Sequence, residues 1–157
     1  MKIELLAVGK TDDKYIDEGI RKYAERVKHY VPFEFNIIPD VKNVRNMTEE
    51  QQKRLEGQAI MNELTSADCV ALLDENGREY TSREFANFCQ KTAVSGAKRL
   101  IFVIGGPYGF SDEVYARANH KVSLSRMTFP HQLVRLIFAE QLYRAQTIIK
   151  GEPYHHD

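Results

Sequence analysis

Five consecutive residues in the last third of the chain, Gly105-Gly106-Pro107-Tyr108-Gly109, have the composition of a ligand-binding loop. They follow a buried apolar run, and open α/β folds bind ligands at the carboxyl ends of their strands. Glycine lets a backbone approach a ligand closely. The spacing is neither G-x-G-x-x-G nor that of a P-loop, so neither a dinucleotide nor a nucleoside triphosphate is indicated. A strand-to-helix turn that needs a positive φ explains the glycines equally well.

A second candidate is the polar run from Ser123 to Gln132, which combines hydroxyl groups with Arg126 and His131 ahead of a predicted helix. So many hydrogen-bonding groups in one short segment suit a binding site. The alternative is an ordinary capped helix with Thr128 at its N-cap.

Further along this helix, charged residues recur, and Glu140 and Arg144 stand four residues apart. Such a pair can satisfy itself without any function. The tail, Gly151-Glu-Pro-Tyr-His-His-Asp, would by itself be a frayed terminus. A hydrolase is not indicated, because the chain lacks a G-x-S-x-G elbow and a paired-carboxylate motif.

Two cysteines, Cys69 and Cys89, lie in apolar stretches without CxxC spacing or a cluster with histidine. They predict reduced core thiols and no metal site. At 157 residues, the length predicts one domain over residues 1–157. The 22 basic and 22 acidic residues balance, which taken alone argues mildly against an RNA-binding protein. No apolar stretch is long enough to cross a membrane and no secretory signal begins the chain, so a cytoplasmic location is expected.

The elements that must position these residues follow an alternating pattern. Four short apolar runs are separated by stretches of helical period, which is typical of an α/β fold with a mostly parallel sheet flanked by helices. The second run alternates at first and predicts an edge strand, whereas the fourth is apolar throughout and predicts a central one. The strands are expected at 3–9, 33–39, 69–74 and 100–104.

The helices are expected after Asp12 or Asp13, after Thr48 with a capping box to Gln51, after Thr81 or Ser82 up to Val94, near Ser111, and from Pro130 to about Ile149. The pair Asn76-Gly77 predicts a tight turn at the end of the third strand. A brief segment, 122–125, precedes the last helix. That helix has a broad apolar surface, which predicts burial against the sheet and a second surface, for which another subunit is one candidate.

Several blocks in register resemble the RlmH family, SPOUT-class enzymes that methylate N3 of pseudouridine 1915 in helix 69 of 23S ribosomal RNA. The similarity covers nearly the whole chain. The most specific blocks are Val103-Ile-Gly-Gly-Pro-Tyr-Gly, Leu124-Ser-Arg-Met-Thr-Phe-Pro-His-Gln-Leu-Val-Arg, Glu140-Gln-Leu-Tyr-Arg-Ala and Pro153-Tyr-His.

The resemblance implies a SPOUT-type domain whose C-terminal segment forms a deep trefoil knot, an arrangement that general topology rules disfavour. It also implies a homodimer and S-adenosylmethionine as the cofactor, without a metal. By motif match, the cofactor-binding residues are Leu73, Gly105, Leu124, Ser125, Arg126, Met127, Thr128 and Phe129. The candidates for the catalytic, substrate side are His131, Arg135, Arg144, Tyr154 and His155, with no role for His156.

The resemblance further implies that Arg135 and His131 hold the RNA base or its phosphates, and that Tyr154 and His155 reach the site, for which the partner chain is one possible source. Balanced charge fits an assembled ribosome as substrate, recognised by shape and ribosomal contacts. Two rivals stay open: a SPOUT methyltransferase that acts on another RNA, and a non-catalytic ribosome- or nucleotide-binding module of the same fold.

Overall fold

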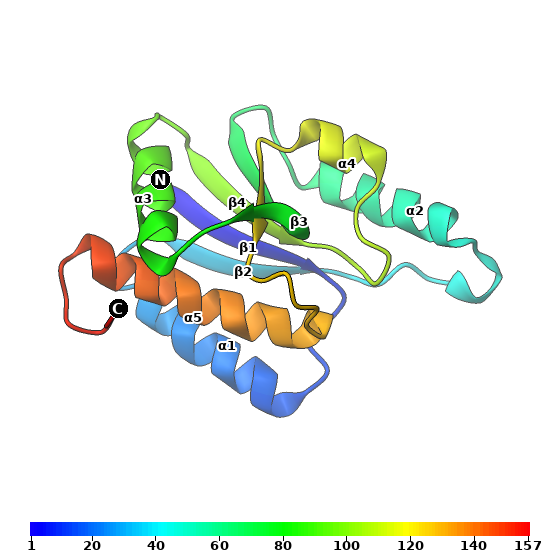
Figure 1. Cartoon of the computed structure of the whole chain (residues 1–157). Helices are drawn as coiled ribbons and strands as arrows, with labels where there is room; N and C mark the ends of the chain where they lie inside the picture. The colour runs from blue at the N-terminus through cyan, green and yellow to red at the C-terminus, as the bar shows by residue number, and fades with distance from the viewer.

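The computed structural model describes all 157 residues and contains one five-stranded sheet in the order β2-β1-β4-β3-β5 (Figure 1). Every pairing in this sheet is parallel, which confirms the predicted α/β class. The predicted edge strand is β2, and the predicted central strand is β4. The strands are β1 (Lys2–Val8), β2 (Phe33–Ile38), β3 (Asp68–Glu79), β4 (Arg99–Ile104) and β5 (His120–Ser123).

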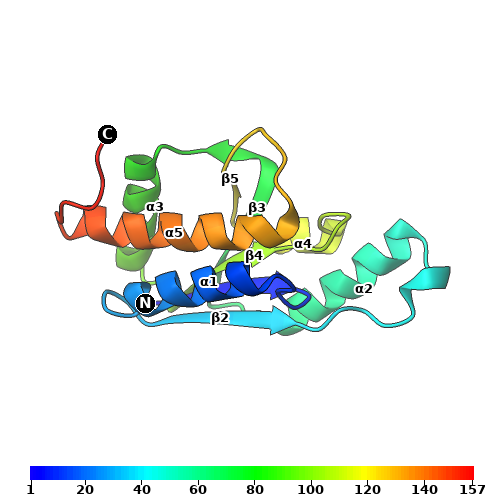
Figure 2. The ribbon, with the colours of Figure 1, turned by 90° about the horizontal axis from the view of Figure 1, so that it is seen from below.

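Helices cover both faces of the sheet (Figures 1 and 2). One face carries α1 (Lys14–Val27), α3 (Ser82–Val94) and α5 (His131–Ile149), whose apolar side chains form the larger core cluster. The other face carries α2 (Glu49–Asn62) and α4 (Asp112–Arg117), which pack over a smaller cluster; a short 3-10 helix, Val44–Asn46, precedes α2. None of these helices is long and apolar enough to cross a membrane.

The helix starts follow from local hydrogen bonds. Thr48 forms the predicted capping box with Gln51, and Thr81, one of two predicted caps, forms a capping box with Glu84. Ser111 caps α4. At α5 the prediction of a Thr128 cap is wrong. The N-cap is Pro130, and the Thr128 hydroxyl donates instead to Glu75 at 3.2 Å.

The broad apolar surface of α5 is largely used within the chain. Figure 2 shows α1 and α5 side by side, and α3 also packs against α5. The contact with α1 is close at Gly19, where a Cβ atom would lie 2.7 Å from Leu136 Cδ1. The surface therefore needs no second subunit to explain it.

The sequence prediction for the end of the third strand is also wrong. Instead of turning at Asn76-Gly77, β3 runs on to Glu79, with a shift in its pairing to β5 between Leu73 and Arg78. A Cβ at Gly77 would lie 2.6 Å from the backbone carbon of Lys121. Glycine is needed here because β5 approaches the backbone of β3, and β5 is itself the strand formed by the predicted brief segment.

The two cysteines are free thiols in different surroundings. Cys89 is buried as predicted, and burial raises its pKa to about 12. Cys69 is only half-buried, so the prediction of a core thiol holds for it in part.

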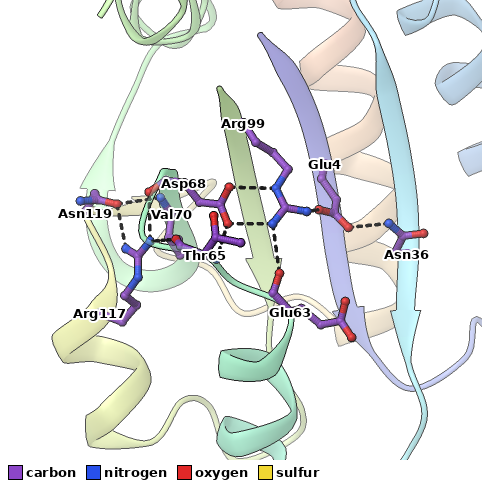
Figure 3. A network of polar contacts seen from close by, with 9 residues as sticks. All are labelled: Glu4, Asn36, Glu63, Thr65, Asp68, Val70, Arg99, Arg117 and Asn119. Atoms are coloured by element: carbon purple, nitrogen blue, oxygen red, sulfur yellow. Dashed lines mark hydrogen bonds and ion pairs between the residues drawn. The ribbon is translucent and has the colours of Figure 1, made fainter. Parts of the chain in front are cut away.

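A network of polar contacts ties together the amino ends of the central strands (Figure 3). Arg99 donates to both carboxylate oxygens of Asp68, at 2.9 and 2.7 Å, and to Glu4 at 2.9 Å. Both carboxylate side chains are only 3% exposed. Burial raises the pKa of Asp68, but hydrogen bonds from Arg99 and Thr65 outweigh burial and bring the pKa below its usual value. This edge of the sheet thus holds a buried charge pair that stabilises the fold.

Replacing Arg99 by Met should lower the free energy of unfolding at pH 7 by roughly 3 kcal/mol, because two buried carboxylates lose their partner. The pKa of Asp68 is depressed in the folded state. The contribution of ionised Asp68 to the free energy of unfolding is therefore present above the unfolded pKa of about 3.9 and is lost as pH falls through the folded pKa. Urea unfolding should therefore show the difference shrinking in acid. A difference independent of pH would contradict the electrostatic account.

Candidate functional site

A cavity of about 470 Å³ opens at the carboxyl ends of β4 and β5, beside the middle of β3 and the start of α5. Its size lies within the usual range for small-molecule sites. The residues that line it come from three segments of the chain: Leu73 to Asn76, Ile104 to Phe110, and a set from Tyr115 to Val134. It is therefore a site built by tertiary structure.

Strand register brings the three segments together. Leu72 pairs with Val103, near the end of β4, and Leu73 pairs with Val122 of β5. The pairing of β3 with β5 is interrupted between Leu73 and Arg78, so this part of β3 lies beside the carboxyl ends of β4 and β5, the usual position of ligands in open α/β folds.

The structure gathers seven of the eight predicted cofactor residues around this cavity. They are Leu73, Gly105, Leu124, Ser125, Met127, Thr128 and Phe129. Arg126 is the exception: its side chain is 85% exposed and forms a 3.3 Å ion pair with Glu79. Arg126 thus lies outside the cavity wall.

The glycine loop combines a tight turn with close packing. Gly109 has a φ of +81°, and its N–H donates to the Gly106 carbonyl at 3.2 Å. The alternative to a ligand-binding role, a turn that needs a positive φ, therefore explains the glycine at position 109. At Gly105 the reason differs, because φ is not positive and a Cβ would lie only 3.0 Å from Phe110 Cε1. Gly105 is thus needed for close packing.

The predicted substrate-side residues do not meet in one chain. His131 lines the cavity and is exposed. Arg135, one turn further, is fully buried: it donates to the Val8 carbonyl at 2.8 Å and to Thr11 at 3.0 Å, and its Nε has no partner. Burial lowers the pKa of Arg135. Arg135 was expected from the sequence to hold the RNA base or its phosphates. In this conformation the buried side chain cannot contact an RNA molecule at the surface.

Arg144, Tyr154 and His155 lie near the other end of α5. Thirteen residues separate His131 from Arg144, which corresponds to roughly 20 Å along a helix. Arg144 pairs with Glu140 at 2.6 Å, as predicted, and a hydrogen bond from Tyr154 reaches Glu140 at 3.4 Å. Within one chain these residues are remote from the cavity.

The tail is docked on this end of the molecule and is not a frayed terminus. Arg144 donates to His155 Nδ1 at 3.1 Å, which places the His155 proton on Nε2, 2.9 Å from Asp157. Tyr30 donates to Glu152 at 2.6 Å, which raises the pKa of Tyr30 to about 12. Burial raises the pKa of Tyr154. These contacts hold Tyr154 and His155 in a defined orientation.

Sequence reasoning missed the acidic side of the cavity. Asp74 and Glu75 follow the buried part of β3, and Tyr115 from α4 donates a hydrogen bond to Asp74. Burial, followed by that hydrogen bond, raises the pKa of Tyr115 to about 12. The available signal was the position of two carboxylates directly after an apolar run, at the edge where ligands bind.

The arrangement suits a ligand that has both an apolar ring and a positive charge. Apolar side chains such as Ile104, Leu124 and Val134 line the cavity beside backbone groups of the glycine loop, and Asp74 and Glu75 supply negative charge. No group of three or more histidines, cysteines and acidic residues is placed to hold a metal ion.

Comparison with known proteins agrees with this fold. A family described as predicted SPOUT methyltransferase matches residues 1–155. A relative from Christiangramia forsetii is 56% identical and one from Parabacteroides distasonis 54% identical, each over 99% or more of both chains, and both are named ribosomal RNA large subunit methyltransferase H. The chain therefore belongs to the SPOUT methyltransferases and, within them, to the RlmH family.

Two solved structures share the fold at low sequence identity. One is a probable methyltransferase from Bordetella pertussis, with a TM-score of 0.55 and 12% identity over 92% of this chain and 96% of that one. The other is a probable methylase family protein from Haemophilus influenzae, with a TM-score of 0.53 and 13% identity over 99% of this chain and 70% of that one.

Replacing Arg135 by Ala should lower the free energy of unfolding by roughly 2–5 kcal/mol, because it empties a large buried site and leaves the Val8 carbonyl without its donor. The matched control is His131→Ala at the exposed start of the helix, which should change stability by less than about 0.5 kcal/mol. Chemical denaturation measures both. Unchanged stability in Arg135→Ala together with weaker RNA binding would instead support a direct substrate contact.

Proposed function

We propose that this protein transfers the methyl group of S-adenosylmethionine to N3 of pseudouridine 1915 in helix 69 of 23S ribosomal RNA. The observation that carries the proposal is the meeting of Leu73, Gly105 and the 124–129 segment around one cavity. The RlmH relatives, named as large-subunit methyltransferases, support ribosomal RNA as the substrate class.

The cavity residues fit S-adenosylmethionine. Backbone groups of the glycine loop and the 124–129 segment would hold the adenosine part, and the apolar side chains of the cavity would accommodate its ring. Asp74 and Glu75 are close enough to the cavity to favour a ligand that carries cationic groups. When bound, this cofactor supplies an electrophilic methyl group on a positively charged sulfur.

The chain's own contribution is orientation and proton handling. Holding two reactants in line is worth effective molarities of about 10⁵ M or more in well-oriented systems. The N3 position of pseudouridine must lose a proton, which calls for a base or a group that stabilises the developing negative charge. His131 lies at the cavity and can hold the base or its phosphate. Arg135 acts from beneath, by donating to the Val8 carbonyl and the Thr11 hydroxyl.

Arg144, Tyr154 and His155 enter the same reaction from a second chain. Because Arg144 lies roughly 20 Å along α5 from His131 and the tail docks beside Arg144, a homodimer is the simplest way to bring these residues to a cavity. The docked tail supports this assignment, since its contacts with Arg144 and Glu140 hold Tyr154 and His155 in place. Each cofactor cavity would then be completed by the tail of the partner.

The target and the setting follow from the same proposal. A chain with balanced charge suits an assembled ribosome, where shape and ribosomal contacts add to phosphate attraction, and we place the protein in the cytoplasm with that substrate. We also propose that residues from β3 to α5 form the deep trefoil knot of SPOUT proteins. An experimental backbone trace of residues 73–149 tests that threading.

Calorimetry should show S-adenosylmethionine binding to the purified protein, which a non-catalytic ribosome-binding module has no need to do. In a strain lacking the gene, mass spectrometry of ribosomal RNA fragments should show the loss of one methyl group from the helix 69 pseudouridine. Added protein should restore it on assembled ribosomes much better than on protein-free RNA. A methyl group lost from a different nucleotide would favour the rival RNA target.

The composite site predicts complementation. A chain truncated before Pro153 should bind cofactor and be inactive, and Gly105→Val should fold and be inactive, because its side chain crowds Phe110 and the cavity. If the two chains are co-expressed and pair at random, about a quarter of the wild-type activity should return, because half of the dimers carry one complete site. No activity in the mixture would mean that the tail completes the cavity of its own chain, which would contradict the composite site.

A further inference from the structure

Glu56 lies on the buried side of α2 and is not among the residues that line the cavity. Its side chain is 3% exposed, and its Oε1 has no hydrogen-bond partner. Its Oε2 accepts one long hydrogen bond, from Gln52 Nε2 at 3.3 Å. Burial raises the pKa of Glu56, and the negative charge of Asp40 acts in the same direction. A buried carboxyl group with so few partners destabilises a fold, which suggests a functional reason for keeping it.

Both oxygens of Glu56 face the glycine loop from behind. A Cβ built on Gly106 would lie 2.5 Å from Oε1 and 2.5 Å from Oε2. Gly106 also lines the cavity. The backbone at Gly106 therefore separates the cavity from the Glu56 carboxyl group, and any shift of that group is transmitted directly to the loop.

The position of Glu56 is fixed by its neighbour. A Cβ on Gly57 would lie 2.3 Å from Ser111 Oγ, so α2 approaches the start of α4 as closely as a glycine allows. Ser111 also caps α4 and follows the loop directly. Two consecutive residues of α2 thus contact this region. Glu56 contacts the glycine loop at Gly106, and Gly57 contacts Ser111, which lies just after the loop.

We propose that Glu56 is a positioning residue for the cofactor: its carboxyl group, held by α2, supports Gly106 and keeps the 105–109 backbone facing the cavity. The inference rests on the proposed function, because it takes the cavity as the S-adenosylmethionine site. Glu56 acts through the loop and does not itself line the cavity. Both oxygens lie against Gly106 without a hydrogen bond to it, so the support is by contact. A leucine side chain ends one atom short of these oxygens and would leave that contact unfilled.

Glu56→Leu tests the proposal. It should raise the Kd and the KM for S-adenosylmethionine at least tenfold, with Tm unchanged or higher, because a poorly partnered carboxyl group has been removed. Glu56→Gln keeps the shape and one acceptor oxygen and should stay within threefold of the wild-type Kd. The control is Glu4→Gln, a buried carboxylate bonded to Arg99, which should lower Tm and leave Kd unchanged.

If Glu56→Leu does not fold, a substitution on the other side of the contact, at Gly106, tests the proposal. In Gly106→Ala the new methyl group points at Glu56 and away from the cavity, so it should raise Kd by displacing the loop. Combining it with Glu56→Ala should remove that clash and return Kd to the value of Glu56→Ala alone.

Wild-type Kd in both Glu56→Leu and Gly106→Ala would overturn the role of Glu56. By contrast, absence of S-adenosylmethionine binding to the wild-type protein would overturn the proposed function itself.

Discussion

The parallel pairing of β3 with β4 and β5 is the constraint on which the site depends. The register aligns Leu72 with Val103 and Leu73 with Val122, so the middle of β3 lies beside the carboxyl ends of β4 and β5. Three segments that are far apart in sequence therefore meet at one cavity. A register shift of one residue would turn the inward side chains outward and dismantle both the core and the cavity wall.

The amino ends of the strands carry groups that stabilise the fold, and the carboxyl ends carry the candidate site. At the amino edge, Arg99 pairs with buried carboxylates, so the strand starts are held by charge. At the carboxyl edge, the chain instead leaves polar groups exposed to a cavity, and the glycines permit close backbone contacts. The costly groups at this edge, such as the unpartnered Oε1 of Glu56, are what a site retained for function is expected to contain.

Local signals in the sequence predicted much of the fold. Capping boxes at Thr48 and Thr81, and the unbroken apolar run of β4, act over a few residues and are visible without tertiary structure. Asn76-Gly77 misled because its conformation is decided by β5, which is remote in sequence. Thr128 is not the cap because α5 begins only at His131, and the Thr128 hydroxyl donates to Glu75, which is also remote in sequence. The burial of Arg135 and the contact of Glu56 with Gly106 are also tertiary, so no local pattern announces them.

A crystal structure with S-adenosylhomocysteine, the product form of the cofactor, would locate the ligand and the tail together. We expect the ligand in the cavity between Leu73, Gly105 and Leu124, with the tail of a second chain carrying Tyr154 and His155 to the cavity entrance. A ligand bound elsewhere on the surface, or a cavity closed by its own chain's tail, would contradict that expectation.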